Sequence, residues 1–194
     1  MYQLSQDALA YIDRCAEELI ALEKTLCQSP APSRREQKRA EFCKEWPEKA
    51  GAKGVYIDEA WNVVFPVHAE GSQQLTLFTG HMDTVFPDGT AEKRPFRIEG
   101  ENYYGPGVGD MKNGDLAMFH IAANLPETEK KCLNIAMVYN PDEEIGSIYS
   151  KEITDRIGCK ADHIFVMESA GKNGTRHCFA RKGSLTYDIE FQGQ

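Results

Sequence analysis

Two residues placed directly after an apolar run have the chemistry of a metal ligand and its support. His81 and Asp83 lie two positions apart, immediately after residues 75–79. Residues i and i+2 of an extended segment point the same way, so the imidazole and the carboxylate can act together. The pair suits a metal-binding His81 whose tautomer and orientation are fixed by Asp83. Taken alone, this spacing does not distinguish a metal site from a structural contact.

A second candidate ligand follows a segment dense in glycine. Asp110 comes after YGPGVG, residues 104–109, and before a segment with a helical pattern. The glycines and the proline let the backbone turn sharply and approach a bound ion closely. A phosphate-binding loop is the competing interpretation, but neither GxxxxGK[ST] nor strand–GxGxxG–helix with a later acidic residue is met. We therefore interpret Asp110 as a metal-binding carboxylate, with a helix N-cap as the alternative.

Acidic residues also end two further apolar runs. Three of them, residues 142–144, follow the run 133–139, and Glu168 follows the run 163–167. Open α/β sheets bind ligands at the carboxyl ends of their strands, and like charges gathered there are unfavourable without a cation. Carboxylates combined with a histidine suit zinc or manganese, and two such ions can share a carboxylate. A solvated acidic turn is the alternative for residues 142–144.

The elements that must position these residues alternate between helical and strand patterns. Apolar residues recur at three- and four-residue steps in the helical segments, and β-formers dominate the short strand runs. A second helix is expected to begin at an N-cap at Ser33, with Glu36 as its capping-box partner, and to end near residue 47. The other predicted helices cover residues 6–26, 113–124 and 148–157. The predicted strands cover residues 55–57, 62–67, 75–79, 96–98, 133–139, 163–167 and 185–191. This alternation predicts an α/β fold with a mixed sheet and crossover helices.

Composition excludes several other classes of function. A net charge of −8 argues against a surface for nucleic acid or anionic membrane. No run approaches the roughly 20 apolar residues of a membrane span, and the amino terminus lacks a signal-peptide pattern, so we expect a cytoplasmic protein. The six cysteines include no CxxC pair and are expected to be reduced and mostly buried. Histidines 68, 120, 163 and 177 lie outside the four segments, and we expect them to be packed or surface residues.

In order, the segments GHMDTVF, YGPGVGDMKNG, NPDEEIGS and MESAG resemble the dinuclear-zinc hydrolases that include glutamate carboxypeptidase, succinyl-diaminopimelate desuccinylase, acetylornithine deacetylase and the aminoacylases. The resemblance covers nearly the whole chain. It implies a zinc-peptidase-like catalytic domain that holds two zinc ions, with manganese or cobalt as alternatives. One departure is Asn113, where many relatives have glycine; it bears on the backbone near Asp110 and not on the ligand itself.

The resemblance also implies a role for each residue of the site. The implied ligands are His81 and Glu168 for one zinc, Glu144 for the other, and Asp110 bridging both beside a cis peptide bond. Asp83 would orient His81. The implied reaction is hydrolysis of an amide bond by a metal-bound water, with Glu143 as the general base that passes the proton to the leaving amine. Because neighbours in extended backbone point apart, Glu144 can grip metal while Glu143 faces the substrate.

The expected function is therefore zinc-dependent amide hydrolysis. HMDTVF and PFRIEG look most like the glutamate carboxypeptidase branch, which favours an exopeptidase acting near a free carboxylate. The alternatives are an N-acyl amino acid deacylase or desuccinylase, and a non-catalytic metal-binding remnant, although a remnant has no reason to keep Glu143. Small peptides or N-acyl amino acids are the expected substrates, and the full-length protein is expected to be a homodimer.

The same resemblance implies a division of the chain. Residues 1–182 are expected to form the amino-terminal part of the catalytic domain, and residues 183–194 the first strand of a lid or dimerisation domain. In relatives, a further histidine ligand and a lid histidine come later in the sequence. We therefore expect a catalytic domain incomplete at its carboxyl end, inactive by itself, with at most one well-formed metal site and uncovered sheet surface that favours self-association.

Overall fold

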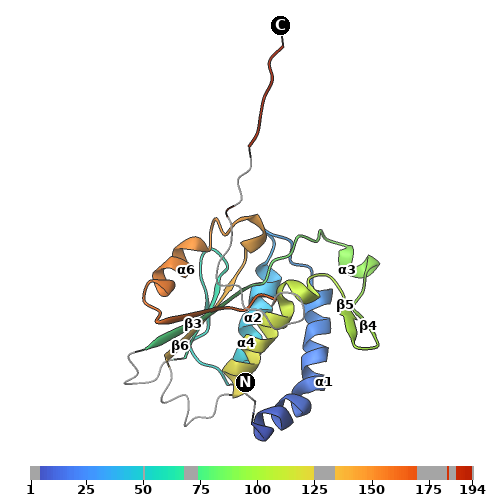
Figure 1. Ribbon diagram of the computed structural model, residues 1–194, viewed down its shortest axis with the longest axis vertical. Coiled ribbons are helices and arrows are strands. Elements are labelled where there is room, and N and C mark those ends of the chain that lie inside the picture. Colours follow the sequence, from blue (N-terminus) through green and yellow to red (C-terminus); the bar gives the residue numbers. More distant parts are fainter. Residues whose placement is uncertain are drawn as a thin grey trace.

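The computed structural model describes residues 5–49, 51–67, 74–124, 134–169, 183 and 187–193. Helices and short strands alternate along the chain (Figure 1). In order they are α1 (Gln6–Gln28), α2 (Gln37–Lys49), β1 (Tyr56–Ile57), β2 (Val63–Val67), β3 (Leu75–His81), α3 (Thr90–Lys93), β4 (Arg97–Glu99), β5 (Asn102–Tyr104), the turn η1 (Val108–Lys112), α4 (Asn113–Asn124), β6 (Asn134–Asn140), the turn η2 (Glu143–Ile145), α6 (Lys151–Gly158) and β7 (His163–Val166).

Five strands form a mixed sheet in the order β1-β2-β6-β3-β7. Strand β3 runs parallel to both β6 and β7, whereas β2 runs antiparallel to β6. The register pairs His81 with Asn140 and Thr79 with Val166, so the carboxyl ends of β3, β6 and β7 meet at one edge of the sheet. The predicted mixed α/β sheet with crossover helices is confirmed, and it brings the segments after these three strands together.

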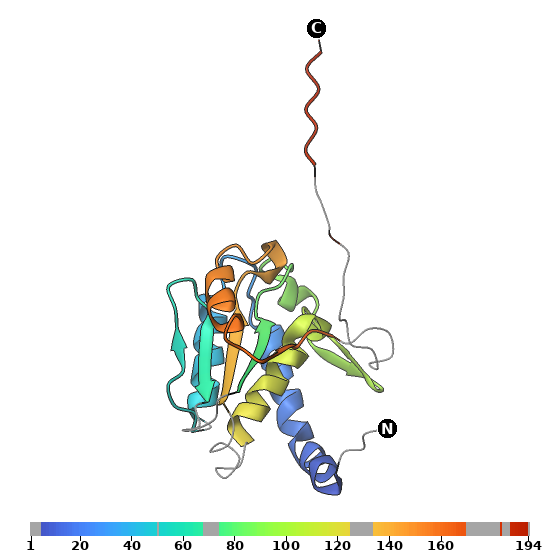
Figure 2. The ribbon, with the colours of Figure 1, turned by 60° about the vertical axis from the view of Figure 1, so that its left-hand side comes forward.

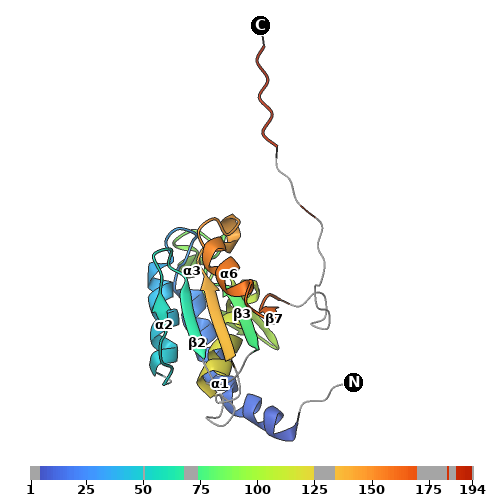
Figure 3. The same cartoon turned by 90° about the vertical axis from the view of Figure 1, so that its left-hand side faces the viewer.

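Helices cover both faces of this sheet. Figure 1 shows α1, α2 and α4 on one side of the sheet and α6 on the other, and Figure 3 shows α6 in front of the strands. Alternate strand residues face the two layers, because successive side chains of a strand point to opposite faces. Toward α1, α2 and α4 the buried residues include Leu26, Ala40, Phe65, Phe119, Met137 and Tyr139. Toward α6 they include Val64, Leu77, Val138 and Ile153. Both faces of β3 and β6 are therefore buried, which fixes their register.

Two predicted helix starts are wrong. The second helix begins at Gln37 and Ser33 is not its N-cap, because Arg34, with φ 75°, lies outside the helical region. The Ser33 hydroxyl instead donates to Asp83 Oδ2 at 2.7 Å. The helix predicted from residue 148 begins at Lys151, and the N–H groups of the two residues before it bond to the Asp142 carboxylate.

The last predicted strand lies partly outside the described residues. Leu185 and Thr186 belong to the part that is not described, and residues 187–193 adopt no regular secondary structure. Figure 2 shows the segment 187–193, in red, apart from the sheet and helices. The division of the chain at residue 183 stays a prediction. Among the described residues, no helix is long and apolar enough to cross a membrane.

Candidate metal centre

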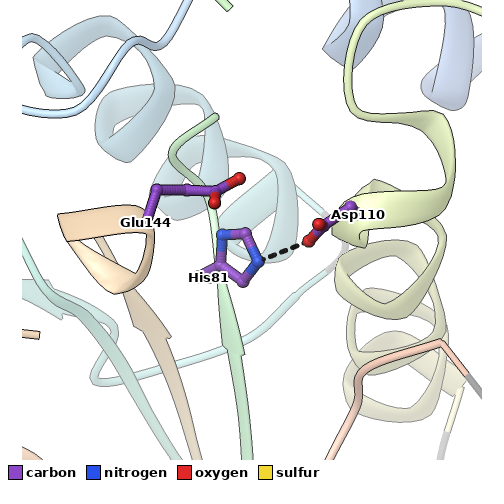
Figure 4. A group of neighbouring side chains, drawn as sticks. All are labelled: His81, Asp110 and Glu144. Carbon is purple, nitrogen blue, oxygen red and sulfur yellow. Dashed lines mark hydrogen bonds and ion pairs between the residues drawn. The ribbon is translucent and has the colours of Figure 1, made fainter. Parts of the chain in front are cut away.

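Side chains from three separate elements converge on the His81 ring at the carboxyl edge of the sheet (Figure 4). His81 Nε2 lies 2.9 Å from Asp110 Oδ1 and 3.3 Å from Glu168 Oε1. One donor atom each of His81, Asp110 and Glu144 lies within 4.8 Å of the others. Two ligand atoms bound to one zinc at 2.0–2.2 Å are separated by roughly 3.3 Å in tetrahedral geometry. The separations of His81 Nε2 from Asp110 and from Glu168 therefore fit donors that share a metal ion.

The buried carboxylate of Asp83 supports this cluster from the Nδ1 side of the His81 ring. The Asp83 side chain is 0% exposed, and its Oδ1 lies 3.2 Å from His81 Nδ1. The same carboxylate accepts the backbone N–H groups of Glu143 at 3.1 Å and Glu144 at 3.2 Å. Ser33, whose role the sequence did not reveal, donates its hydroxyl to the other oxygen. Asp83 thus orients the histidine and fixes the turn that carries two acidic side chains.

The backbone around Asp110 presents its carboxylate outward. Asp110 has φ −141° and ψ 93°, and its peptide bond to Met111 is cis, as the resemblance implied. The side chain is 66% exposed and faces His81, so the helix N-cap alternative does not describe it. Helix α4 begins only at Asn113.

The departure at Asn113 leaves this backbone undisturbed. Asn113 has φ −62° and ψ −37°, which any residue adopts, and its Oδ1 accepts the Gly114 N–H at 2.9 Å. Glycine is needed one position later, because a Cβ on Gly114 would lie 2.1 Å from the Met167 carbonyl oxygen. The close approach of α4 to the end of β7 therefore depends on Gly114.

The acidic segment after β6 is a short 3-10 turn. The prediction that Glu143 and Glu144 diverge because their backbone is extended is wrong, since Glu143–Ile145 form η2. Three residues per turn still separate successive side chains by roughly 120°. Glu144 joins the cluster at His81, while Glu143 is exposed. Asp142 is buried and accepts the Tyr149 N–H at 2.5 Å, so a solvated acidic turn does not describe it.

The charges of the cluster favour a bound cation. Burial alone would lower the pKa of His81, but hydrogen bonds and charge from Asp83 and Glu168 raise it to about 11. Burial raises the pKa of Glu143 and of Glu144, and neighbouring carboxylates including Asp110 add to both increases. The site thus concentrates negative charge around one imidazole. Nitrogen and carboxylate donors in such a site suit zinc or manganese.

The remaining histidines and cysteines lie elsewhere or outside the described residues. His120 is buried in α4, with its Nδ1 3.2 Å from the Tyr11 hydroxyl, and His163 is exposed at the opposite end of β7 from Glu168. His68 and His177 fall outside the described residues. Free thiols are found at Cys15, Cys27, Cys43 and Cys159, while Cys132 and Cys178 are not described. Within the described part, His81 is the histidine that the site holds.

Comparisons with known proteins agree on one family. A family model described as peptidase family M20/M25/M40 matches residues 77–193. Carboxypeptidase G2 of Pseudomonas sp. (strain RS-16) is 30% identical over 134 residues, covering 69% of this chain and 32% of that protein. A putative succinyl-diaminopimelate desuccinylase of Mycobacterium tuberculosis is 33% identical over 128 residues, covering 66% and 34%.

A solved structure has a similar fold. The crystal structure of an M20 family metallo-carboxypeptidase from Sulfolobus solfataricus superposes with a TM-score of 0.65 at 23% identity, covering 79% of this chain and 38% of that one. The chain spans about a third of the length of the curated relatives that it matches.

Proposed function

Because the chain belongs to peptidase family M20/M25/M40, we propose that it carries the metal-binding site of a zinc-dependent amide hydrolase. The observation that supports this most directly is the convergence of His81, Asp110 and Glu144 within 4.8 Å, with Glu168 3.3 Å from the same ring. Core packing alone does not require carboxylates from separate segments of the chain to surround one imidazole. The donor set fits zinc, with manganese or cobalt as alternatives.

The residues divide the work as follows. His81 and Glu168 would hold one zinc, Glu144 the second, and Asp110 would bridge both. When bound, the metal supplies a Lewis acid that polarises a carbonyl and acidifies water. With the metal bound, Asp83 would keep the proton of His81 on Nδ1 and leave the Nε2 lone pair for coordination. The donors His81, Asp110 and Glu168 make one complete protein ligand set within the described residues.

Glu143 is proposed as the general base. It is the exposed member of the acidic turn, and the charges of His81, Glu168, Asp83 and Asp110 act on its carboxylate. Partial burial of the carboxylate, together with the charges of Glu168, Asp83 and Asp110, raises its pKa toward the neutral range, where a base both accepts and returns a proton. It would take a proton from water and pass it to the leaving amine.

The proposed substrates are small peptides or N-acyl amino acids. Similarity to carboxypeptidase G2 supports an exopeptidase that acts near a free carboxylate. Similarity to a desuccinylase supports the alternative, hydrolysis of an N-acyl amino acid. We further propose that the full-length protein is a cytoplasmic homodimer and that residues 183–194 begin a lid or dimerisation domain.

Metal analysis tests the proposal first. Purified chain, stripped with a chelator and reloaded, is expected to bind zinc at one site, and His81→Ala is expected to lose most of it. His163→Ala, at the opposite end of the sheet, is the matched control and is expected to bind zinc as the wild type does. Absence of zinc both before and after reloading would refute the proposal.

A further inference from the structure

A buried arginine lies beneath the segment that carries the histidine ligand. Arg39, in α2, is 0% exposed. Its guanidinium donates to the carbonyl of Met82 at 3.4 Å, to that of Leu26 at 2.5 Å and to that of Ser29. Met82 follows His81 directly, and the other two carbonyls end helix α1. One side chain of α2 thus ties the end of α1 to the residue after the ligand.

A buried aspartate lies against the residue before the ligand. Asp115, in the first turn of α4, is 0% exposed, and neither carboxylate oxygen has a hydrogen-bond partner among the described residues. A Cβ on Gly80 would lie 3.1 Å from Asp115 Oδ1 and 2.5 Å from Met111 Cε. The absence of a side chain at Gly80 therefore leaves room for Met111 and Met118 as well as for Asp115, which packs against it. His81 is flanked by Asp115 on one side and Arg39 on the other.

The two side chains interact electrostatically across this segment. Burial raises the pKa of Asp115 to about 8, and the charges of His81, Arg39 and Lys112 oppose that rise. Burial lowers the pKa of Arg39, and Asp115 is among the groups that oppose this change. A buried arginine keeps its charge, and a buried charge without a counter-charge is strongly destabilising. Replacing such a pair by apolar residues is nevertheless often neutral or stabilising, so stability by itself does not account for the pair. Its place on both sides of His81 suggests another role.

We propose that Arg39 and Asp115 are positioning residues that hold segment 80–83 so that His81 Nε2 faces its partner ligands. The proposal rests on the metal site proposed above. Neither side chain contributes a donor atom to that site. Arg39 acts through the Met82 carbonyl, and Asp115 acts through its buried carboxyl group, whose Oδ1 faces Gly80.

Four variants test this in the full chain: Arg39→Met, Arg39→Lys, Asp115→Asn and, as a control, Ile153→Ala. Ile153 lies in α6 and is buried against the opposite face of the sheet, so its truncation destabilises the fold without touching the segment. Zinc dissociation constants come from competition with a chromophoric chelator. Absorption spectra of the Co²⁺ forms report ligand geometry, and circular dichroism with urea unfolding reports folding.

Arg39→Met and Asp115→Asn are expected to weaken zinc binding by about 10–100-fold, as the loss of supporting residues around a metal typically does. They should also shift the Co²⁺ spectrum, and Arg39→Lys should recover part of the affinity. Ile153→Ala should leave both readouts unchanged even where urea unfolds it earlier. Should Arg39→Met fail to fold, Asp115→Asn and Arg39→Lys decide the matter.

Two results would overturn the inference: wild-type zinc affinity and Co²⁺ spectrum in folded Asp115→Asn and Arg39→Lys, or an equal loss of affinity in Ile153→Ala. In either case the wild-type chain still binds zinc, so the proposed metal site stands. A wild-type chain that binds no metal removes both proposals together.

Discussion

The substitution Asp83→Asn tests the residue that supports His81 without removing a metal ligand. The amide has nearly the shape of the carboxylate, but one oxygen becomes an NH₂ group. If that group replaces Oδ2, it meets the Ser33 hydroxyl, which can turn to accept, and the Glu144 N–H, which cannot. If it replaces Oδ1, it meets the Glu143 N–H and forces His81 Nδ1 to accept, which moves the imidazole proton to Nε2. The first orientation is the less costly one.

The expected cost follows from that orientation. One buried backbone N–H loses its partner and the remaining bonds lose their charge, which destabilises the folded state by about 1–3 kcal/mol. Zinc affinity falls by about 10–100-fold, because His81 no longer faces a carboxylate. Ser33→Ala removes only the hydroxyl contact and serves as the control, with a cost of about 0.5–1.5 kcal/mol and little change in metal binding. Urea unfolding and chelator competition measure the two quantities; a folded Asp83→Asn protein with wild-type zinc affinity would refute the reasoning.

Three further predictions address the base, the backbone and a buried acid. In the full-length enzyme, Glu143→Gln should keep the metal content and lower kcat by about 10²–10⁴-fold, and equal loss of metal and turnover would make Glu143 a ligand instead. Gly114→Ala should destabilise the fold by about 1–3 kcal/mol and weaken zinc binding, since its Cβ would lie 2.1 Å from the Met167 carbonyl oxygen; Gly109→Ala, whose Cβ would meet nothing within 4 Å, is the control in the same unfolding and zinc titrations. Burial raises the pKa of Glu23 from 4.5 to about 6. Between these two values the folded chain retains a proton that the unfolded chain has already released, so the free energy of unfolding falls as pH rises. Relative to wild type, Glu23→Gln should therefore gain about 2 kcal/mol in unfolding free energy between pH 4 and pH 7, while the exposed Glu17→Gln should not.

Residue order along the strands was enough to predict most of the site. An apolar run that ends in His81, and others that end in acidic turns or Glu168, place donors at one edge once the strands are parallel. Helix α4 was predicted with the bounds that the structure has, from Asn113 to Asn124, because its pattern is regular. The strand Asn102–Tyr104 was missed, since it begins with Asn, which is depleted in strands, and lies between Gly100 and Gly105.

What the sequence could not reveal depends on partners far away in the chain. Ser33 and Glu36 match a capping box, yet the Ser33 hydroxyl bonds to Asp83, fifty residues later. Arg39 and Asp115 are charged residues in segments of mixed polarity, and a pattern that assigns charges to the surface places both outside, whereas both are fully buried. Local signals identify the donors at the site, and tertiary contacts determine what holds them.

Among the residues that the structure describes, strand β7 pairs with β3 alone, and its own residues are exposed. Glu168 follows this edge strand, whereas His81 ends the strand beside it. An ion bound to both would therefore act as a cross-link that fastens the edge of the sheet to its centre. Metal binding would then stabilise the folded state, and β7 would be stabilised more than the other strands. Amides of β7 should gain more protection from hydrogen exchange on zinc loading than those of β2. Removal of the ion would therefore first cause β7 to fray.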